Sequence, residues 1–173
     1  MDHGLDDSVV LLREWADGDS AWYAESARDP LIQRFTTESP TLDAGEVLAA
    51  IIGLRGASDA EGFVICDAVT GERLGNIALS HDGRAGEVSF WVAAPARGRG
   101  VAARALTLFS LWSFQNAGLD ELWLRVHREN VASQRTAVRA GYQRDPGRDE
   151  SQEVKGAVWP MLGYTLRRPI SYT

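Results

Sequence analysis

The sequence predicts a single mixed α/β (α+β) domain. The first half of the chain alternates β-like runs with short turns, which is typical of an antiparallel meander. The second half changes to a strand–helix–strand–helix–strand order. The 173 residues contain no repeat, low-complexity segment or interdomain linker, so one domain over residues 1–173 is expected, with residues 1–7 as a flexible tail.

The first half is expected to hold two helices among short strands. Asp19 or Ser20 is suited to cap a helix that Asp29-Pro30 would end, because proline restricts the residue before it to extended conformations. A second helix is predicted over residues 44–54. The predicted strands cover residues 9–12, 62–68, 73–80 and 87–92, with turns at 69–72 and 81–83.

The second half is expected to begin with a helix over residues 101–115, which is apolar almost all round and therefore deeply packed. Asn130 is suited to cap a helix that runs through Arg139, and Gly141 stands where a left-handed C-cap belongs. The remaining segments are a strand over 121–126, a polar mobile loop over 145–155 and a last β segment over 158–166.

Composition and charge exclude several classes of function. The formal net charge is −6 and the acidic residues are spread along the chain, which disfavours nonspecific nucleic-acid binding. Cys66 is the one cysteine, so neither an internal disulfide nor a cysteine-paired metal site is possible, and a buried, inert thiol is expected. The N-terminus lacks the apolar core of a signal peptide and no run reaches the length of a membrane span, so we expect a cytoplasmic protein without a membrane partner.

The segment between the strand over 87–92 and the buried helix indicates an anion site. Glycines allow backbone N–H groups to converge on an anion, and the helix N-terminus adds the positive end of its dipole. Two arginines add full charges. The segment has the order Arg97-Gly98-Arg99-Gly100-Val101-Ala102 and predicts a cradle for a pyrophosphate.

Two other interpretations of this segment stay open. The glycines could form only a tight turn, with the arginines solvated. Gly98-x-Gly100-x-x-Ala103 also fits a dinucleotide-binding fingerprint, with Glu129 near the end of the next strand. An antiparallel hairpin precedes the segment, however, and charged arginines crowd the glycines, so a nicotinamide cofactor is disfavoured.

The same residues resemble a known family. Arg97-x-x-Gly100-x-Ala102 matches the Q/R-x-x-G-x-G/A signature of the GNAT superfamily of acetyl-CoA-dependent N-acetyltransferases. The segments over 29–35, 87–92 and 130–133, the last followed by Gly141-Tyr142, are similar to its RimJ/RimL branch. The resemblance extends from about residue 9 to residue 166.

The resemblance implies a GNAT-type fold, with a mixed, mostly antiparallel central sheet whose strands over 87–92 and 121–126 splay apart. The pantetheine arm of acetyl-CoA would lie in that gap, beside the backbone of Trp91 and Val92. Asn130 would bind the pantetheine and Arg135 a cofactor phosphate, although a plain helix cap and a solvated side chain explain these two residues equally well. The pyrophosphate would be held by Arg97, Gly98, Arg99, Gly100, Val101 and Ala102.

Acylation of an amine requires a base for the amine proton, a donor for the carbonyl oxygen and a proton for the leaving thiolate. Glu87 is the first candidate for the base, and His81 is the alternative. Many GNAT enzymes place a tyrosine acid where this chain has Ala137, so Ser133, which matches the serine of the RimJ/RimL branch, is the candidate acid. Tyr142 is expected in the core. No metal is implied.

The resemblance implies transfer of an acetyl group to a protein N-terminus or a small primary amine, and the acidic chain favours a cationic acceptor. The alternatives are a non-catalytic, coenzyme A-binding regulatory module of the same fold and, with less support, an NAD(P)-binding protein. A homodimer, common in this branch, is a further expectation. The segments over 19–54 and 145–155 are expected to shape the acceptor cleft.

Overall fold

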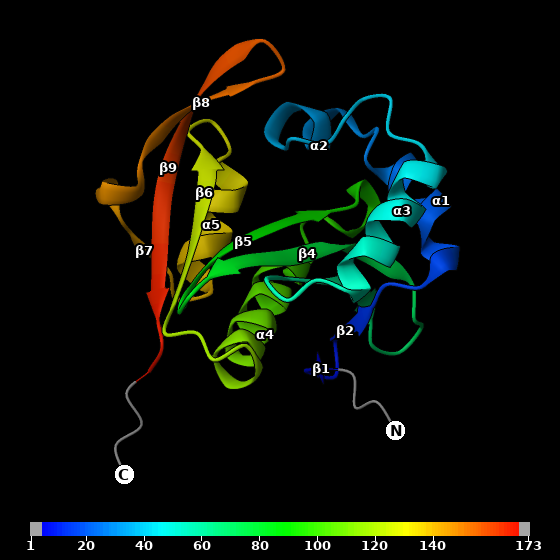
Figure 1. The fold of residues 1–173 in the computed structure, drawn as a ribbon, viewed down its shortest axis with the longest axis horizontal. Coiled ribbons are helices and arrows are strands. Elements are labelled where there is room, and N and C mark those ends of the chain that lie inside the picture. Colours follow the sequence, from blue (N-terminus) through cyan, green and yellow to red (C-terminus); the bar gives the residue numbers. More distant parts are fainter. Residues whose placement is uncertain (1–4, 170–173) are drawn as a thin grey trace.

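The computed structural model describes residues 5–169, which form one nine-stranded sheet with helices on both faces (Figure 1). The strand order is β1-β2-β3-β4-β5-β6-β9-β7, and β8 pairs with β9. The strands are β1 (Leu5–Asp6), β2 (Val10–Glu14), β3 (Ala60–Asp67), β4 (Arg73–Asp82), β5 (Ala85–Val92), β6 (Glu121–His127), β7 (Gln143–Arg144), β8 (Glu150–Val154) and β9 (Ala157–Arg167). The helices are α1 (Ser20–Ser26), α2 (Pro30–Phe35), α3 (Ala44–Arg55), α4 (Val101–Asn116) and α5 (Val131–Arg139).

The main core lies between one face of the sheet and α4, with α5 beside it. Leu106 and Phe109 of α4 are fully buried there, against Ile77, Val88 and Leu124 of the sheet. Tyr142 is 2% exposed, and its hydroxyl lies 2.8 Å from the Ser110 hydroxyl, which confirms its predicted place in the core.

A second core fills the opposite face of the N-terminal half of the sheet, under α1 and α3. Trp15, Val64 and Cys66 lie in this core, and Cys66 is fully buried as predicted. Burial raises the pKa of its thiol. α3 begins with a capping box, in which the Asp43 carboxylate accepts a hydrogen bond from the Glu46 amide at 2.9 Å and the Glu46 carboxylate accepts one from the Asp43 amide at 3.0 Å.

The sheet opens between its two central strands. β5 and β6 are parallel, and their register holds only Ala85↔Glu121, Gly86↔Leu122 and Glu87↔Trp123. Beyond Glu87, β5 continues along β4 as far as Val92, while β6 continues along β9. Figure 1 shows the two strands diverging from that point. The splay and the mostly antiparallel sheet confirm the predicted fold.

Two expectations about elements were wrong. The segment over 145–155 is not a mobile loop: it contains a 3-10 turn at Pro146–Arg148 and strand β8, which forms a hairpin with β9. β8 has the sequence ESQEV and is mostly exposed, so it lacks the alternation of apolar residues that marks a half-buried strand. Asp29-Pro30 ends α1 but also starts α2, where the Asp29 carboxylate accepts hydrogen bonds from the Leu31 and Ile32 amides, both at 3.1 Å.

The expected N-terminal tail contains a short strand. Leu5 and Asp6, in the expected N-terminal tail, pair with β2, and residues 1–4 lie outside the described part. Within residues 5–169, no helix is both long and apolar enough to span a membrane.

Candidate active site

The loop between β5 and α4 has the geometry of an anion cradle. Gly98 and Gly100 have φ angles of 74° and 75°, a left-handed conformation that glycine adopts without strain. A Cβ atom placed on either glycine would meet no other heavy atom within 4 Å, so this side of the loop is open. Gly100 is the N-cap of α4 and has no side chain to bind the first-turn N–H groups, whereas Asp43 and Asn130 cap α3 and α5. The loop and α4 therefore offer backbone donors to a phosphate.

The two arginines of the loop are paired with carboxylates from the first half of the chain. Arg97 donates to Asp29 at 2.5 Å, and Arg99 lies 3.6 Å from Asp67. The Arg97 guanidinium, together with the backbone N–H groups of α2, holds the pKa of Asp29 below its ordinary value. These ion pairs bring the net charge of the loop close to zero. The groups that mainly attract an anion are therefore the backbone N–H groups and the positive end of the helix dipole.

The backbone of β5 beyond Glu87 provides an open strand edge. β6 has left this edge, so the N–H and C=O groups of alternate residues within 88–92, those not bonded to β4, face the gap and can pair with an extended ligand. The Trp91 side chain points away from this edge into a cluster on the α1–α2 side: its ring stacks on Trp22 with centroids 5.8 Å apart, and it is 6% exposed. Trp91 and Val92 are thus suited to contact a pantetheine arm through their backbones.

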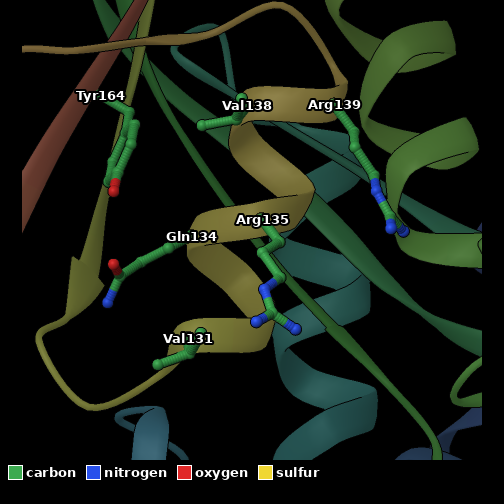
Figure 2. Close-up of a pocket in the computed structure, with 6 residues that line it drawn as sticks. All are labelled: Val131, Gln134, Arg135, Val138, Arg139 and Tyr164. Carbon is green, nitrogen blue, oxygen red and sulfur yellow. The ribbon is translucent and has the colours of Figure 1, made fainter.

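The α5 candidates have different surroundings. Asn130 accepts a hydrogen bond from the Ser133 amide at 3.1 Å and is a helix N-cap, as predicted. Ser133 is half-buried, and no hydrogen bond from the described residues engages its hydroxyl. Arg135 is exposed beside a shallow hollow of about 360 Å³. Figure 2 shows Gln134 and Val138 pointing toward Tyr164, whereas Arg135 projects from another side of α5.

Glu87 lies at the last paired position before the strands separate. Both of its carboxylate oxygens accept hydrogen bonds from Arg125 of β6, at 3.1 and 3.2 Å. The same guanidinium contacts Glu150 of β8 and covers the Trp123 ring, with 4.9 Å from Cζ to the ring centroid. His81 projects from the other face of the sheet, because it pairs with Gly86, the neighbour of Glu87, and successive strand residues alternate between faces. Glu87 and His81 therefore project from opposite faces of the sheet.

Helix α2, which the sequence did not predict, contacts both Glu129 and the β8–β9 hairpin. Arg34 of α2 forms an ion pair with Glu129 at 2.7 Å, and Lys155, at the tip of the β8–β9 hairpin, donates to the Gln33 carbonyl oxygen at 2.8 Å. Figure 1 shows α2 beside this hairpin tip, across the mouth of the gap. Asp29-Pro30 is itself a helix-start signal that could have revealed α2. No local pattern could have revealed its long-range contacts.

The comparisons with known proteins agree with this geometry. The model of the acetyltransferase (GNAT) domain matches residues 10–143. The chain belongs to the GNAT acetyltransferase family. The predicted resemblance is thereby confirmed, and the protein is an acetyltransferase that uses acetyl-CoA. A search of curated protein sequences finds no protein that matches this chain.

Several solved structures share the fold of the acetyltransferase at low sequence identity. RimJ from Mycobacterium smegmatis in complex with CoA-disulfide has a TM-score of 0.81 and 21% identity, covering 91% of this chain and 81% of RimJ. Spermidine N-acetyltransferase from Vibrio cholerae in complex with CoA and spermine has a TM-score of 0.82 and 18% identity, covering 93% and 96%. The ribosomal-protein-S5-alanine acetyltransferase from Vibrio fischeri has a TM-score of 0.81 and 16% identity, covering 96% and 97%.

The fold also decides against the dinucleotide-binding interpretation. That fingerprint opens a repeated parallel sheet, whereas β5–β6 is the one parallel pair among the described strands. Within residues 5–169, no group of three or more His, Cys, Asp or Glu side chains is placed to hold a metal ion. The open glycine loop fits acetyl-CoA instead, because its backbone donors can approach a pyrophosphate without a Cβ in the way.

Proposed function

We propose that the acetyltransferase transfers the acetyl group of acetyl-CoA to a cationic primary amine, either a protein N-terminus or a small amine. The observation that carries the proposal is the parting of β5 from β6 beyond Glu87. This gap has the open glycine loop at one end and an acidic face at the other. The residues around it divide accordingly into a cofactor side and an acceptor side.

On the cofactor side, the loop from Arg97 to Ala102 would bind the pyrophosphate through main-chain N–H groups. The glycine conformations and the uncapped start of α4 support this role. The backbones of Trp91 and Val92 would pair with the pantetheine arm. Asn130 would add a hydrogen bond, and Arg135, exposed on α5, is the remaining candidate for a phosphate contact.

The chemical roles follow from the proton balance of the reaction. Acetyl-CoA, when bound, supplies the acetyl group as a thioester: a carbon–nitrogen bond forms to the amine and the carbon–sulfur bond breaks. We assign Glu87 to accept the amine proton through a water molecule, because a carboxylate has lone pairs left after two hydrogen bonds from Arg125. We assign Ser133, whose hydroxyl is free of protein partners within the described residues, to protonate the departing sulfur.

The preference for a cationic acceptor rests on the charge of the acceptor side. Glu87 and Glu150 share the single guanidinium of Arg125, so the three groups together carry one negative charge. Glu38 adds another negative charge near Trp91, partly offset by the positive charge of Lys155. The acceptors named for the fold relatives, spermidine and the alanine of ribosomal protein S5, are both amines. An acidic site raises the local concentration of such cations.

The test is release of free thiol from acetyl-CoA by the purified protein, with alaninamide as a mimic of a protein N-terminus and spermidine as a small amine. Acceptor-dependent thiol release, with the acetylated amine identified by mass spectrometry, is the expected result. Saturable binding of acetyl-CoA without transfer to either amine would instead support the regulatory coenzyme A-binding module. A homodimer in the cytoplasm completes the proposal, and sedimentation of the purified protein tests the dimer.

A further inference from the structure

Glu38 is a carboxylate on the acceptor side with an unusual set of partners. It lies in the segment between α2 and α3, and its Oε1 atom accepts hydrogen bonds from the Tyr23 hydroxyl and, at 3.3 Å, from the Trp91 indole N–H. Both donors are neutral, so they orient the carboxylate without cancelling its charge. Burial, followed by the charge of Glu38, raises the pKa of the Tyr23 phenol and keeps it a donor.

The second oxygen of this carboxylate is available to a ligand. Within the described residues, no hydrogen bond or ion pair engages Oε2 of Glu38. Other carboxylates around the gap differ, because Glu87 and Glu150 contact Arg125 and Glu129 contacts Arg34. Lys155 is the cation whose charge acts on Glu38, and its ammonium group is already bound to the Gln33 backbone and side chain, at 2.8 and 3.0 Å.

Aromatic rings surround the same position. The Tyr23 ring meets Trp91 edge-on at 5.0 Å between centroids and Trp15 at 5.3 Å, and Trp22 stacks on Trp91. Rings of this kind exclude water, which strengthens a charge–charge contact, and their faces attract cations. A fixed carboxylate with a free oxygen beside such rings is suited to an organic ammonium ion.

The position of the cluster connects it to the reaction. Trp91 lies on the same face of β5 as Glu87, because residues two apart on a strand share a face. Their Cα atoms are four steps apart along the strand, which is about 13 Å at 3.3 Å per step. The Glu38 carboxylate therefore lies on the same face of the sheet as the proposed base.

We propose that Glu38 binds a second ammonium group of a polyamine acceptor, away from the amine that reacts beside Glu87, and so determines the preference of the enzyme for acceptors with more than one cationic group. This inference rests on the proposed function, and it adds a residue that acts on acceptor binding rather than on proton transfer. Tyr23 and Trp91 are positioning residues that orient the carboxylate.

The test compares Glu38→Gln with the unaltered protein, using alaninamide and spermidine as acceptors. Glutamine keeps an oxygen for Tyr23 and Trp91 but removes the charge. A hydrogen bond to a charged group is typically worth a factor of about 10 to 100 in affinity, so KM for spermidine should rise about tenfold or more while kcat changes by less than about twofold. KM for alaninamide, which has a single amine, should stay unchanged. Rising salt should increase KM for spermidine in the unaltered protein and have little effect in the variant.

Two controls separate this inference from other outcomes. Glu153→Gln removes an exposed carboxylate of β8 and should leave both KM values unchanged. Tyr23→Phe keeps the ring but loses one donor to Glu38, and it should raise KM for spermidine by less than Glu38→Gln does. An unchanged KM for spermidine in Glu38→Gln, an equal rise in KM for alaninamide, or a fall in kcat alone would overturn the inference. Calorimetric titration with spermidine measures the affinity of Glu38 for the amine even if the protein acetylates neither acceptor. The failure of this inference can therefore be distinguished from the failure of the proposed function.

Discussion

Replacing Gly100 with glutamate tests the cofactor loop most directly. Gly100 has a φ angle of 75° and open space at its Cβ position, so a side chain has room but must adopt a left-handed backbone. That conformation costs a residue other than glycine about 1–2 kcal/mol, which lowers the melting temperature of a domain of this size by roughly 2–8 °C. The new carboxylate would also face the bound pyrophosphate. At about 8 Å and an effective dielectric constant of about 20, one pair of like charges costs about 2 kcal/mol, a roughly thirtyfold weaker Kd.

The assay is calorimetric titration with acetyl-CoA at low salt, with NADH as a comparator that should not bind. Gly100→Gln shares the backbone strain without the charge, so the ratio of Kd between the glutamate and glutamine variants measures the electrostatic part. Gly118, beyond the other end of α4, has a φ angle of 65° and equally open space. Gly118→Glu should therefore lower the melting temperature comparably and leave the Kd for acetyl-CoA unchanged. Equal Kd values for Gly100→Glu and Gly100→Gln would refute an anion site at this loop.

Three further predictions concern proton transfer and stability. Glu87→Gln should lower kcat by about 10²–10⁴, whereas unchanged turnover would exclude Glu87 as the base. Ser133→Ala should lower kcat with little change in the Kd of acetyl-CoA, and full activity in the same thiol assay would exclude it as the acid. Asp19 is 1% exposed and paired with Arg13 and Arg73 at 2.7 and 2.6 Å, so Asp19→Asn should destabilise the fold by about 3–5 kcal/mol in urea unfolding. Burial raises the pKa of Asp19, but hydrogen bonds from both arginines and from a backbone N–H outweigh burial, so the net pKa is lowered. The ion pairs therefore stabilise the fold fully above the unfolded-state pKa of about 4, and this stabilisation is lost as the pH falls below that value. Lowering the pH from 6 to 3 should therefore reduce the urea midpoint more in the unaltered protein than in Asp19→Asn. An equal reduction in both proteins would contradict this account.

The strand and the turn on the cofactor side could be predicted because their signals are local. The predicted strand over residues 87–92 lies within β5, where Val88, Phe90 and Val92 pack against the main core. The glycines after it marked the turn into α4, where the structure has left-handed backbone. Each of these features is encoded by neighbouring residues.

The acceptor side could not be predicted in the same way, because its features depend on residues far apart in the chain. Arg97 meets Asp29 across 68 residues, and Lys155 meets Gln33 across 122. β8 is polar and stabilised by its hydrogen-bonded ladder with β9, so hydrophobic periodicity did not reveal it. Glu38 lies in a polar segment with no repeating pattern, and only its contacts with Tyr23 and Trp91 distinguish it from an ordinary surface glutamate.

The ion pair between Asp29 and Arg97 joins the helix that borders the acceptor to the loop that receives the cofactor. Asp29 caps α2 and at the same time neutralises Arg97, so one carboxylate would connect the proposed acceptor side with the proposed cofactor loop. Two ligands that bias a shared contact obey thermodynamic linkage: the factor by which acetyl-CoA changes the affinity for the amine equals the factor by which the amine changes the affinity for acetyl-CoA. If the proposed sides are correct, the Asp29–Arg97 ion pair would transmit this reciprocal effect, and measuring each affinity with the other ligand present would give its size.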